Sequence, residues 1–363
     1  MEISPFPHQG PLEPGQVRGR DPLVADLTER LTARRVTALL GPRRFGKTSV
    51  LRRVTADMAD AGASVIWVDL YEVTSVADLA RRFDSGLAEA TGQVRGRLDD
   101  LAVGLTFDLG FLGVDLARRS DERPDADAAF AALLDTLVAG ARATPTVLVI
   151  DELPGIERVP GAAGLLRTKL QHHVQEVGLA FAGSQPSLMR TMFVDPARPF
   201  YAQADLVEIE PFTPAAVEEI VVEGFRSTGR QPGQAAPLIH RFTGGHPYRT
   251  MQAADALWRV VEPGGGPADG CWTTALDRLR DETNLANEAA FGARRGGEKA
   301  VLRLVAHGDA LFGSTADLLG LSAGAAQHAR EALVANGDVT ATDGRLRIVD
   351  PVLADWVRNR FPR

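Results

Sequence analysis

The chain has 363 residues, of which 45% are hydrophobic and 24% charged, and its formal net charge is −7. This length suffices for two or three domains, and the composition is that of a globular protein rather than a disordered or fibrous one. The acidic balance argues against a protein that coats polyanions, and no apolar run reaches the roughly 18 residues of a membrane helix.

The N-terminal residues and the single cysteine point to the cytoplasm. Met1 to Gly15 is rich in proline and glycine and has no apolar run, so it lacks the pattern of a secretory signal. Cys271 is the only cysteine and has no partner for an intramolecular disulfide. A lone thiol is typical of a reducing compartment, and we therefore expect a cytoplasmic protein.

The first elements after the proline-rich arm alternate between helix and strand. Leucines recur at helical spacing from Leu23 to Leu31 and predict a helix. Val36 to Leu40 is a short apolar run before a glycine loop, which is typical of a buried strand. A helix is expected after Gly46, and Val65 to Leu70 predicts a second buried strand.

The middle of the chain continues this alternation of helices and strands after a segment with a different residue pattern. Apolar residues alternate with polar or small ones between Leu101 and Leu116, which predicts either a strand pair within an insertion at 93–125 or a loop. Strands that alternate with helices indicate a parallel sheet with right-handed crossovers. The further elements that we expect are a helix at Ala126–Ala141, a strand at Val147–Ile150, a helix at Leu165–Val177, and strands at Leu179–Ala182 and Leu206–Ile209.

The pattern becomes helical after Pro211. Thr213 can cap a helix that has Pro214 at its first position, where a missing N–H costs nothing. We therefore expect an α/β core at 1–211 with an N-terminal arm at 1–16, a helical lid at 212–293 and a third domain at 294–363.

The third domain has the element order of a winged helix-turn-helix. A short helix ends with Leu318 to Leu321, a turn follows, and Ala325 to Val334 predicts the next helix. Val339–Ala341 and Leu346–Ile348 flank Asp343-Gly344, which is a strong signal for a two-residue hairpin.

The strongest motif is a phosphate-binding loop. Residues 41–48 fit the pattern G-x-x-x-x-G-K-[ST] without a mismatch, between a buried strand and an amphipathic helix. Backbone N–H groups of such a loop and the positive end of the helix bind phosphates, while the lysine reaches the outer phosphates and the hydroxyl ligates magnesium. The residues that we expect at ATP or ADP are Gly41, Pro42, Arg43, Arg44, Phe45, Gly46, Lys47, Thr48 and Ser49.

Two acids follow another apolar strand. Val147 to Ile150 leads directly into Asp151 and Glu152. Asp151 would hold Mg²⁺, and Glu152 would polarise the attacking water as general base. A glutamate in this position is what a hydrolase requires and a mere nucleotide binder does not. We also expect a small polar residue, Ser184 or Gln185, at the end of the strand between the loop strand and the acidic strand.

These residues resemble the archaeal-type ATPases of the STAND group (signal-transduction NTPases with numerous domains) in the AAA+ superfamily, in a bacterial branch. The resemblance covers nearly the whole chain. It rests on Gly19-Arg20-Asp21, the loop at 41–48, Asp151-Glu152, Ala182-Gly183-Ser184, Thr243 to Tyr248, and Asp350-Pro351 with Trp356.

The resemblance implies roles for further residues. Gly19 and Arg20 would lie by the adenine and ribose, and Pro247 on the lid would pack against the nucleotide. His246 would either sense phosphate or cap a helix. The lid would then couple the nucleotide state to domain orientation.

One departure concerns a catalytic arginine. Relatives often carry a Gly-Arg pair before the fifth strand, and here Gln203 stands in place of the arginine. Arginine fingers contribute several powers of ten in rate. Either hydrolysis is slow, or another arginine such as Arg167 or Arg190 substitutes.

The third domain lacks the charge of a strong DNA binder. Between Glu298 and Arg363 eight cations stand against eight acids, and the expected recognition helix offers only Gln327, His328 and Arg330. We favour a self-associating or partner-binding switch ATPase. The alternatives are a DNA-acting ATPase that docks through the winged helix and a nucleotide-binding scaffold with negligible turnover.

Overall fold

The computed structural model describes residues 2–91, 126–142, 144–313, 316, 319–342 and 344–362. The strand pair expected between Leu101 and Leu116 lies outside the described residues. The short helix expected to end at Leu321 falls partly outside them.

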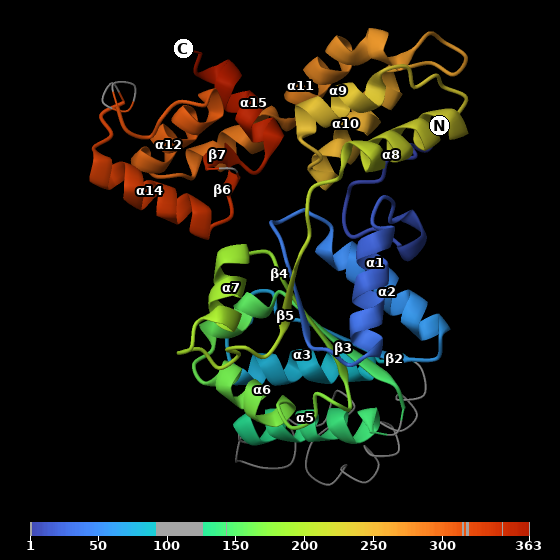
Figure 1. Ribbon diagram of the computed structural model, residues 1–363, viewed down its shortest axis with the longest axis vertical. Helices are drawn as coiled ribbons and strands as arrows, with labels where there is room; N and C mark the ends of the chain where they lie inside the picture. The colour runs from blue at the N-terminus through green and yellow to red at the C-terminus, as the bar shows by residue number, and fades with distance from the viewer. Residues whose placement is uncertain are drawn as a thin grey trace, which may run out of the picture.

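A parallel five-stranded sheet forms the lower body of the molecule in Figure 1. The strand order is β2-β3-β4-β1-β5, so β4 lies between the loop strand and the acidic strand, as the sequence predicted. Leu40 at the end of β1 aligns with Gly183 of β4 and Glu208 of β5, which places their carboxyl ends at one edge. The strands are β1 (Thr37–Leu40), β2 (Ser64–Asp69), β3 (Thr146–Asp151), β4 (Gly178–Gly183) and β5 (Asp205–Glu208).

Helices cover both faces of this sheet and fully bury its central strands β1, β3 and β4. Apolar side chains of α1 (Asp21–Thr32) and α2 (Lys47–Asp60) pack on one face with Leu39, Val149 and Ala182. The opposite face packs against α3 (Val76–Ala88), α5 (Ala126–Ala141), α6 (Ala162–Leu170) and α7 (Pro186–Val194).

The helix predicted at Leu165–Val177 is wrong at both ends. It begins at Ala162 and ends at Leu170, and turns occupy residues 171–176. Gln175 gives its backbone carbonyl to Arg34 rather than to a helical N–H, and the amide of Glu176 bonds to His173 only three residues earlier. The polar residues after Leu170 therefore leave the helix where its apolar face ends.

Four helices lie above the carboxyl edge of the sheet: α8 (Pro214–Ser227), α9 (Ala235–Thr243), α10 (Pro247–Val260) and α11 (Trp272–Gly292). The hydroxyl of Thr213 accepts the amide of Ala216 at 3.2 Å and Pro214 opens α8, which confirms the predicted cap. Phe6 of the N-terminal arm is buried among these helices, and a Cβ at Gly224 would lie only 2.4 Å from its ring. The arm is thus anchored on the helical region.

The C-terminal elements form a separate apolar cluster. They are α12 (Gly296–His307), α14 (Ala323–Ala335), the antiparallel pair β6 (Val339–Thr342) and β7 (Arg345–Ile348), and α15 (Pro351–Arg360). The hairpin confirms the predicted strand pair around Gly344, whose φ of 72° suits the tight turn. In the described part of the chain, each helix is too short or too polar to cross a bilayer.

Candidate nucleotide-binding site

The loop between β1 and α2 has the tight geometry that phosphate binding requires. Gly46 caps α2 with φ 86°, and Arg44 lies in the left-handed region at φ 66°. A Cβ at Gly41 would lie 2.2 Å from Ile209, so only glycine lets β1 lead into the loop beside β5. Strained backbone of this kind is concentrated at functional sites.

Lys47 is buried at the centre of the loop. Its ammonium group donates to the carbonyls of Gly41 at 2.8 Å and Pro42 at 2.9 Å. Burial lowers the pKa of Lys47 to about 8, against an upward effect of the nearby Glu152 and Asp151. Within the described part of the chain Lys47 forms no ion pair, and a buried cation of this kind is suited to bind a phosphate group.

The predicted magnesium residues lie in direct contact. The hydroxyl of Thr48 donates to the Oδ2 carboxylate oxygen of Asp151 at 2.8 Å, across from α2 to the end of β3. Burial raises the pKa of Asp151, although the hydrogen bond from Thr48 opposes this rise. Hard oxygen donors from one hydroxyl and one carboxylate are the set that Mg²⁺ takes together with substrate phosphates.

Glu152 and Ser184 also meet at this edge of the sheet. The Oε2 oxygen of Glu152 accepts the backbone amide of Ser184 at 3.1 Å and its hydroxyl at 2.9 Å. Glu152 adopts φ 50°, a left-handed conformation that few non-glycine residues take. The turn after β3 thereby directs the carboxylate toward β4.

These residues border a cavity of about 520 Å³ between the sheet edge and the helices above it. Its volume lies in the range of ordinary ligand sites. Of the residues predicted to bind nucleotide, those that line the cavity are Arg20, Arg43, Arg44, Phe45, Gly46, Lys47, Thr48, Ser49 and Pro247, together with Glu152 and Ser184.

The other predicted binding residues lie behind this lining. Gly19 has φ 64°, and a Cβ there would lie 3.1 Å from Ala216 of α8, so it supports the turn rather than facing the cavity. Gly41 packs on Ile209, and Pro42 borders a different recess.

His246 takes the second of its two predicted roles, that of a helix cap. Its Nδ1 atom accepts the amide of Arg249 at the start of α10, and its ring contacts Phe45 edge-on at a centroid distance of 4.8 Å. Burial lowers the pKa of His246 to about 4 and keeps the ring neutral. The ring borders the recess behind the loop and not the cavity.

The N-terminal arm supplies a wall of the cavity that the sequence did not reveal. Residues 7–12 line it, and the amide of Leu12 donates to the hydroxyl of Ser49 at 3.0 Å. Tyr248 of α10 closes the same side, with His8 edge-on to its ring at 5.8 Å and Arg44 stacked on it at 4.7 Å. The one feature of the sequence that could have indicated this wall is Phe6, an apolar residue directly before residues 7–12.

Arg20 faces the cavity with unused hydrogen-bonding capacity. It is 8% exposed and stacks on Phe212 at 4.3 Å, and its buried Nη2 atom has no partner among the described residues. Burial lowers the pKa of Arg20 to about 10, although the charge of Glu210 opposes this. A buried donor without a partner is costly unless a ligand accepts from it.

The candidate substitutes for the missing arginine do not border the cavity. Arg190 pairs with Glu208, and neither it nor Arg167 lines the site. Gln203 donates to the carbonyl of Tyr201 at 3.4 Å in the turn before β5.

Comparison with known proteins agrees with this geometry. A family model described as an ATPase domain predominantly from Archaea matches residues 24–252. The matched segment contains the loop, both acids, Ser184 and Pro247. No sequence among the curated proteins matches the chain.

Several solved structures share the fold over nearly the whole chain. The Walker-type ATPase PABY2304 of Pyrococcus abyssi is 18% identical, with a TM-score of 0.71 over 98% of this chain and 99% of that one. The Orc2 protein of Aeropyrum pernix, solved with ADPNP and ADP, is 15% identical, with a TM-score of 0.51 over 98% and 96%. The Orc1 protein of the same organism, solved with DNA, is 15% identical, with a TM-score of 0.50 over 94% and 93%.

Proposed function

Because this chain belongs to the archaeal-type family of AAA+ P-loop ATPases and is an ATPase, we propose that it works as a nucleotide-dependent switch of the STAND type. ATP binding and slow hydrolysis would change the orientation of a helical lid, 212–293, and a winged helix-turn-helix domain, 294–363, relative to the core at 1–211. That change would control association with a protein partner or a second copy. The observation that carries this proposal is the first turn of α10, which contacts both the phosphate loop and the C-terminal elements.

Binding of the nucleotide follows from the lining of the cavity. Lys47 would exchange its two carbonyl partners for the outer phosphates. Arg20, whose Nη2 atom has no partner, would donate to the ribose or base, and Pro247 would pack on the nucleotide from above. Arm residues 7–12 and Met251 would enclose its remaining apolar surface.

Hydrolysis would be carried out by the acids at the end of β3. Thr48 and Asp151 would hold Mg²⁺, which supplies charge neutralisation on the phosphates when bound. Glu152 would accept the proton of the attacking water, and Ser184 would orient the outer phosphate once its hydroxyl is released from Glu152. We propose slow turnover because neither Arg167 nor Arg190 lines the cavity.

Coupling would run through α10. Phe45 of the loop contacts His246, and Arg44 stacks on Tyr248. The next residue, Arg249, is buried and forms a two-point ion pair with Asp350, which caps α15. A shift of the loop on nucleotide binding therefore reaches the C-terminal elements through side chains in contact.

The alternative is an ATPase that acts on DNA through the C-terminal elements. Its support is the arrangement of α12, α14 and the β6–β7 hairpin and the fold shared with a protein solved with DNA. The balanced charge of residues 298–363 makes this the second choice.

The proposal is tested with Glu152→Gln, which should bind ATP without hydrolysing it. Size-exclusion chromatography of this variant is run with ATP, with ADP and without nucleotide. We expect larger assemblies only in the run with ATP. Asp84→Asn, a carboxyl-to-amide change on α3 outside the cavity, is the control. Turnover that rises severalfold with duplex DNA at low salt and falls at high salt would favour the alternative. A protein of one size in all three nucleotide states, with no DNA effect, would contradict both.

A further inference from the structure

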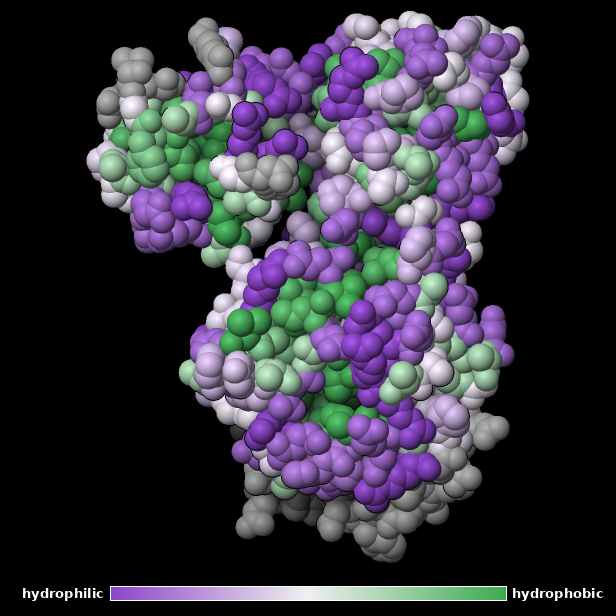
Figure 2. Space-filling view, in the orientation of Figure 1, coloured by the Kyte–Doolittle hydropathy of each residue, from purple (hydrophilic) through white to green (hydrophobic). Residues whose placement is uncertain are grey.

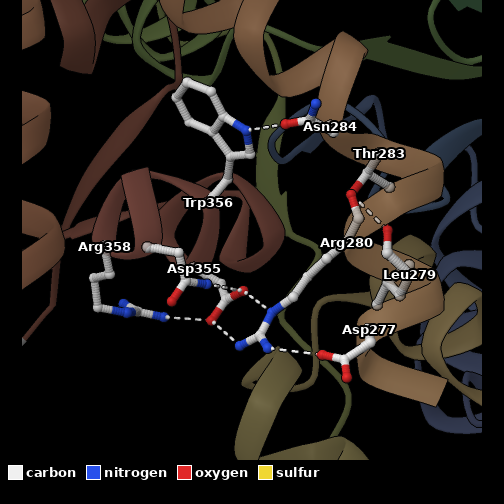
Figure 3. Close-up of polar contacts among 9 residues, drawn as sticks. Asp277, Leu279, Arg280, Thr283, Asn284, Asp355, Trp356 and Arg358 are labelled. Atoms are coloured by element: carbon white, nitrogen blue, oxygen red, sulfur yellow. Dashed lines mark hydrogen bonds and ion pairs between the residues drawn. The ribbon is translucent and has the colours of Figure 1, made fainter. Parts of the chain in front are cut away.

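The C-terminal elements are joined firmly to the helical region. Figure 3 shows Arg280 of α11 donating to both carboxylate oxygens of Asp355 on α15, at 2.9 and 3.2 Å. Nearby, the indole N–H of Trp356 donates to Asn284 at 2.7 Å. Two-point arginine–carboxylate pairs fix orientation as well as distance.

A second pair strengthens this joint where it approaches the nucleotide cavity. Arg249 is 5% exposed, and its Nε and Nη2 atoms donate to the two carboxylate oxygens of Asp350 at 2.9 and 2.5 Å. Removing one partner of a buried ion pair is strongly destabilising, because the other charge is left buried without compensation. The helical region and the C-terminal elements are therefore expected to move as one body.

The contact between the C-terminal elements and the sheet region is much smaller. A recess of about 550 Å³ lies between them and the helical region, and green hydrophobic residues border it in Figure 2. The end of α14 crosses to α7, where the hydroxyl of Ser187 donates to the carbonyl of Val334 at 3.2 Å. A Cβ at Gly337 would lie 3.8 Å from Pro186 and 4.0 Å from the carbonyl oxygen of Ser184.

This small contact lies on the segment that holds the catalytic glutamate. Ser184 directly follows β4, and Pro186 and Ser187 begin α7 two and three residues later. Ser184 gives both its amide and its hydroxyl to Glu152. The α14–β6 turn therefore lies against the short segment, residues 184–187, whose first residue binds Glu152.

We propose that the contact of Val334 and Gly337 with residues 184–187 is a releasable latch, in which Ser187 is a positioning residue that keeps Ser184 bound to Glu152. This inference rests on the proposed switch and specifies how hydrolysis is controlled. In the latched state the Ser184 hydroxyl is committed to Glu152 and does not reach phosphate, and Glu152 Oε2 already accepts two hydrogen bonds. Release of α14 frees the turn, and Ser184 and Glu152 become available to phosphate and water.

We expect the α14–α7 contact to break while the C-terminal elements stay attached to the helical region, because the first contact is weaker than the second. The joint to the helical region contains two buried or partly buried two-point ion pairs. Among the polar contacts of the described residues, the joint of α14 to α7 shows a single neutral hydrogen bond, which is weaker than a hydrogen bond between charged groups. A rotation of the lid therefore breaks the α14–α7 contact first.

The first test prevents latching without touching the cavity. Ser187→Arg places a long charged side chain where α14 approaches, and Ser85→Arg on the exposed face of α3 makes the same chemical change elsewhere. We expect Ser187→Arg to raise kcat for ATP at least threefold with little change in KM, and Ser85→Arg to match the wild type. Ser187→Ala, which removes only the hydrogen bond, should raise kcat by a smaller factor.

The second test holds the latch closed. In a Cys271→Ser background, Ser187→Cys and Asn336→Cys are joined by a short cleavable crosslinker. We expect the crosslinked protein to bind ATP but to lose at least nine-tenths of its turnover, and cleavage of the linker to restore it. The two single-cysteine proteins, treated in the same way, should keep full turnover.

The outcomes separate the latch from the switch. If Ser187→Arg leaves kcat unchanged and the crosslinked protein turns over normally, while ATP still changes the assembly of Glu152→Gln, the latch is wrong and the switch stands. If ATP does not change the assembly state of Glu152→Gln and every variant has the kcat of the wild type, both the switch and the latch are wrong.

Discussion

Ser184 donates its backbone amide and its hydroxyl to one and the same carboxylate oxygen of Glu152, at 3.1 and 2.9 Å. The two residues come from the ends of adjacent strands, β4 and β3, so the parallel register of the sheet brings them together. This contact links the group that would activate water to the turn that meets the C-terminal elements. Changes in this pair therefore report on both catalysis and domain position.

The titration of Lys47 predicts how ATP affinity depends on pH. Burial lowers the pKa of Lys47 to about 8, and bound phosphate favours the charged form, so binding above pH 8 takes up a proton. ATP affinity should fall between pH 7.5 and 9.5, by at most about tenfold per pH unit. Calorimetry in two buffers of different ionisation enthalpy would detect the proton. Lys47→Arg remains charged throughout, so its affinity should vary little, and a flat wild-type profile would refute the prediction.

Arg20 is predicted to lower the stability of the free protein and to strengthen ATP binding, because its Nη2 atom is buried without a partner among the described residues. Its lowered pKa shows that the folded protein disfavours the charged side chain, and this penalty applies at all pH values below about 10. Arg20→Met should therefore leave the melting temperature of the free protein equal or higher. The rise in melting temperature caused by ATP should shrink, because the variant lacks the donor to the nucleotide. A variant with lower intrinsic stability and an undiminished ATP shift would place Arg20 in a purely structural role.

The N-terminal arm is predicted to matter for binding through its anchor. Phe6 is 1% exposed between Gly224 and Phe225, and Phe6→Ala should cost about 3–5 kcal/mol if the arm stays docked. If the arm instead detaches from the helical region, the loss of unfolding free energy is smaller, but residues 7–12 leave the cavity wall. ATP affinity should then fall at least fivefold. Ile3→Ala, at a position 89% exposed, is the control and should change neither quantity. Affinity equal to that of the wild type in Phe6→Ala would show that the arm does not contact nucleotide.

The Arg249–Asp350 pair is predicted to stabilise the joint between α10 and α15. Burial raises the pKa of Asp350, but the hydrogen bonds and charge of Arg249 outweigh this and leave the pKa below its usual value. The pair therefore contributes stability above pH 4 that is lost as the pH falls through the lowered pKa. Arg249→Ala should lower the free energy of unfolding by about 3–5 kcal/mol in urea titrations at pH 7. Adding Asp350→Asn, which keeps an acceptor for the α15 cap, should recover part of this loss, and an equal or larger loss would contradict the pairing.

The sequence was sufficient for the sheet and for placing the polar side chains at its edge. The five strands follow from short apolar runs, because a parallel sheet covered on both faces buries its central strands, here β1, β3 and β4. Lys47, Thr48, Asp151 and Glu152 follow from one glycine pattern and one pair of acids. Each depends on neighbours in sequence, and local pattern therefore reveals them.

The parts that depend on distant contacts could not be predicted. The arm reads as a proline-rich tail, and nothing nearby in sequence indicates that Phe6 would fit against Gly224. The contact of Gly337 with the turn after Ser184 joins residues about 150 positions apart. Arg34, in the turn after α1, donates to the Gln175 carbonyl beyond the end of α6, a contact between residues 141 positions apart. His246 caps α10 through a local bond from the amide of Arg249, whereas its ring contact with Phe45 joins residues about 200 positions apart.

The most direct test of the switch is the distance between the core and the C-terminal elements in each nucleotide state. Pulsed electron paramagnetic resonance would measure this distance between spin labels at Ser85→Cys on α3 and Arg360→Cys on α15. The labelled protein would also carry Cys271→Ser and Glu152→Gln. Both positions are exposed, so the labels should not disturb packing. We predict one distance distribution without nucleotide and with ADP, and a clearly shifted one with ATP. Superimposable distributions in all three states, with ATP binding verified, would contradict the claim that nucleotide controls domain orientation.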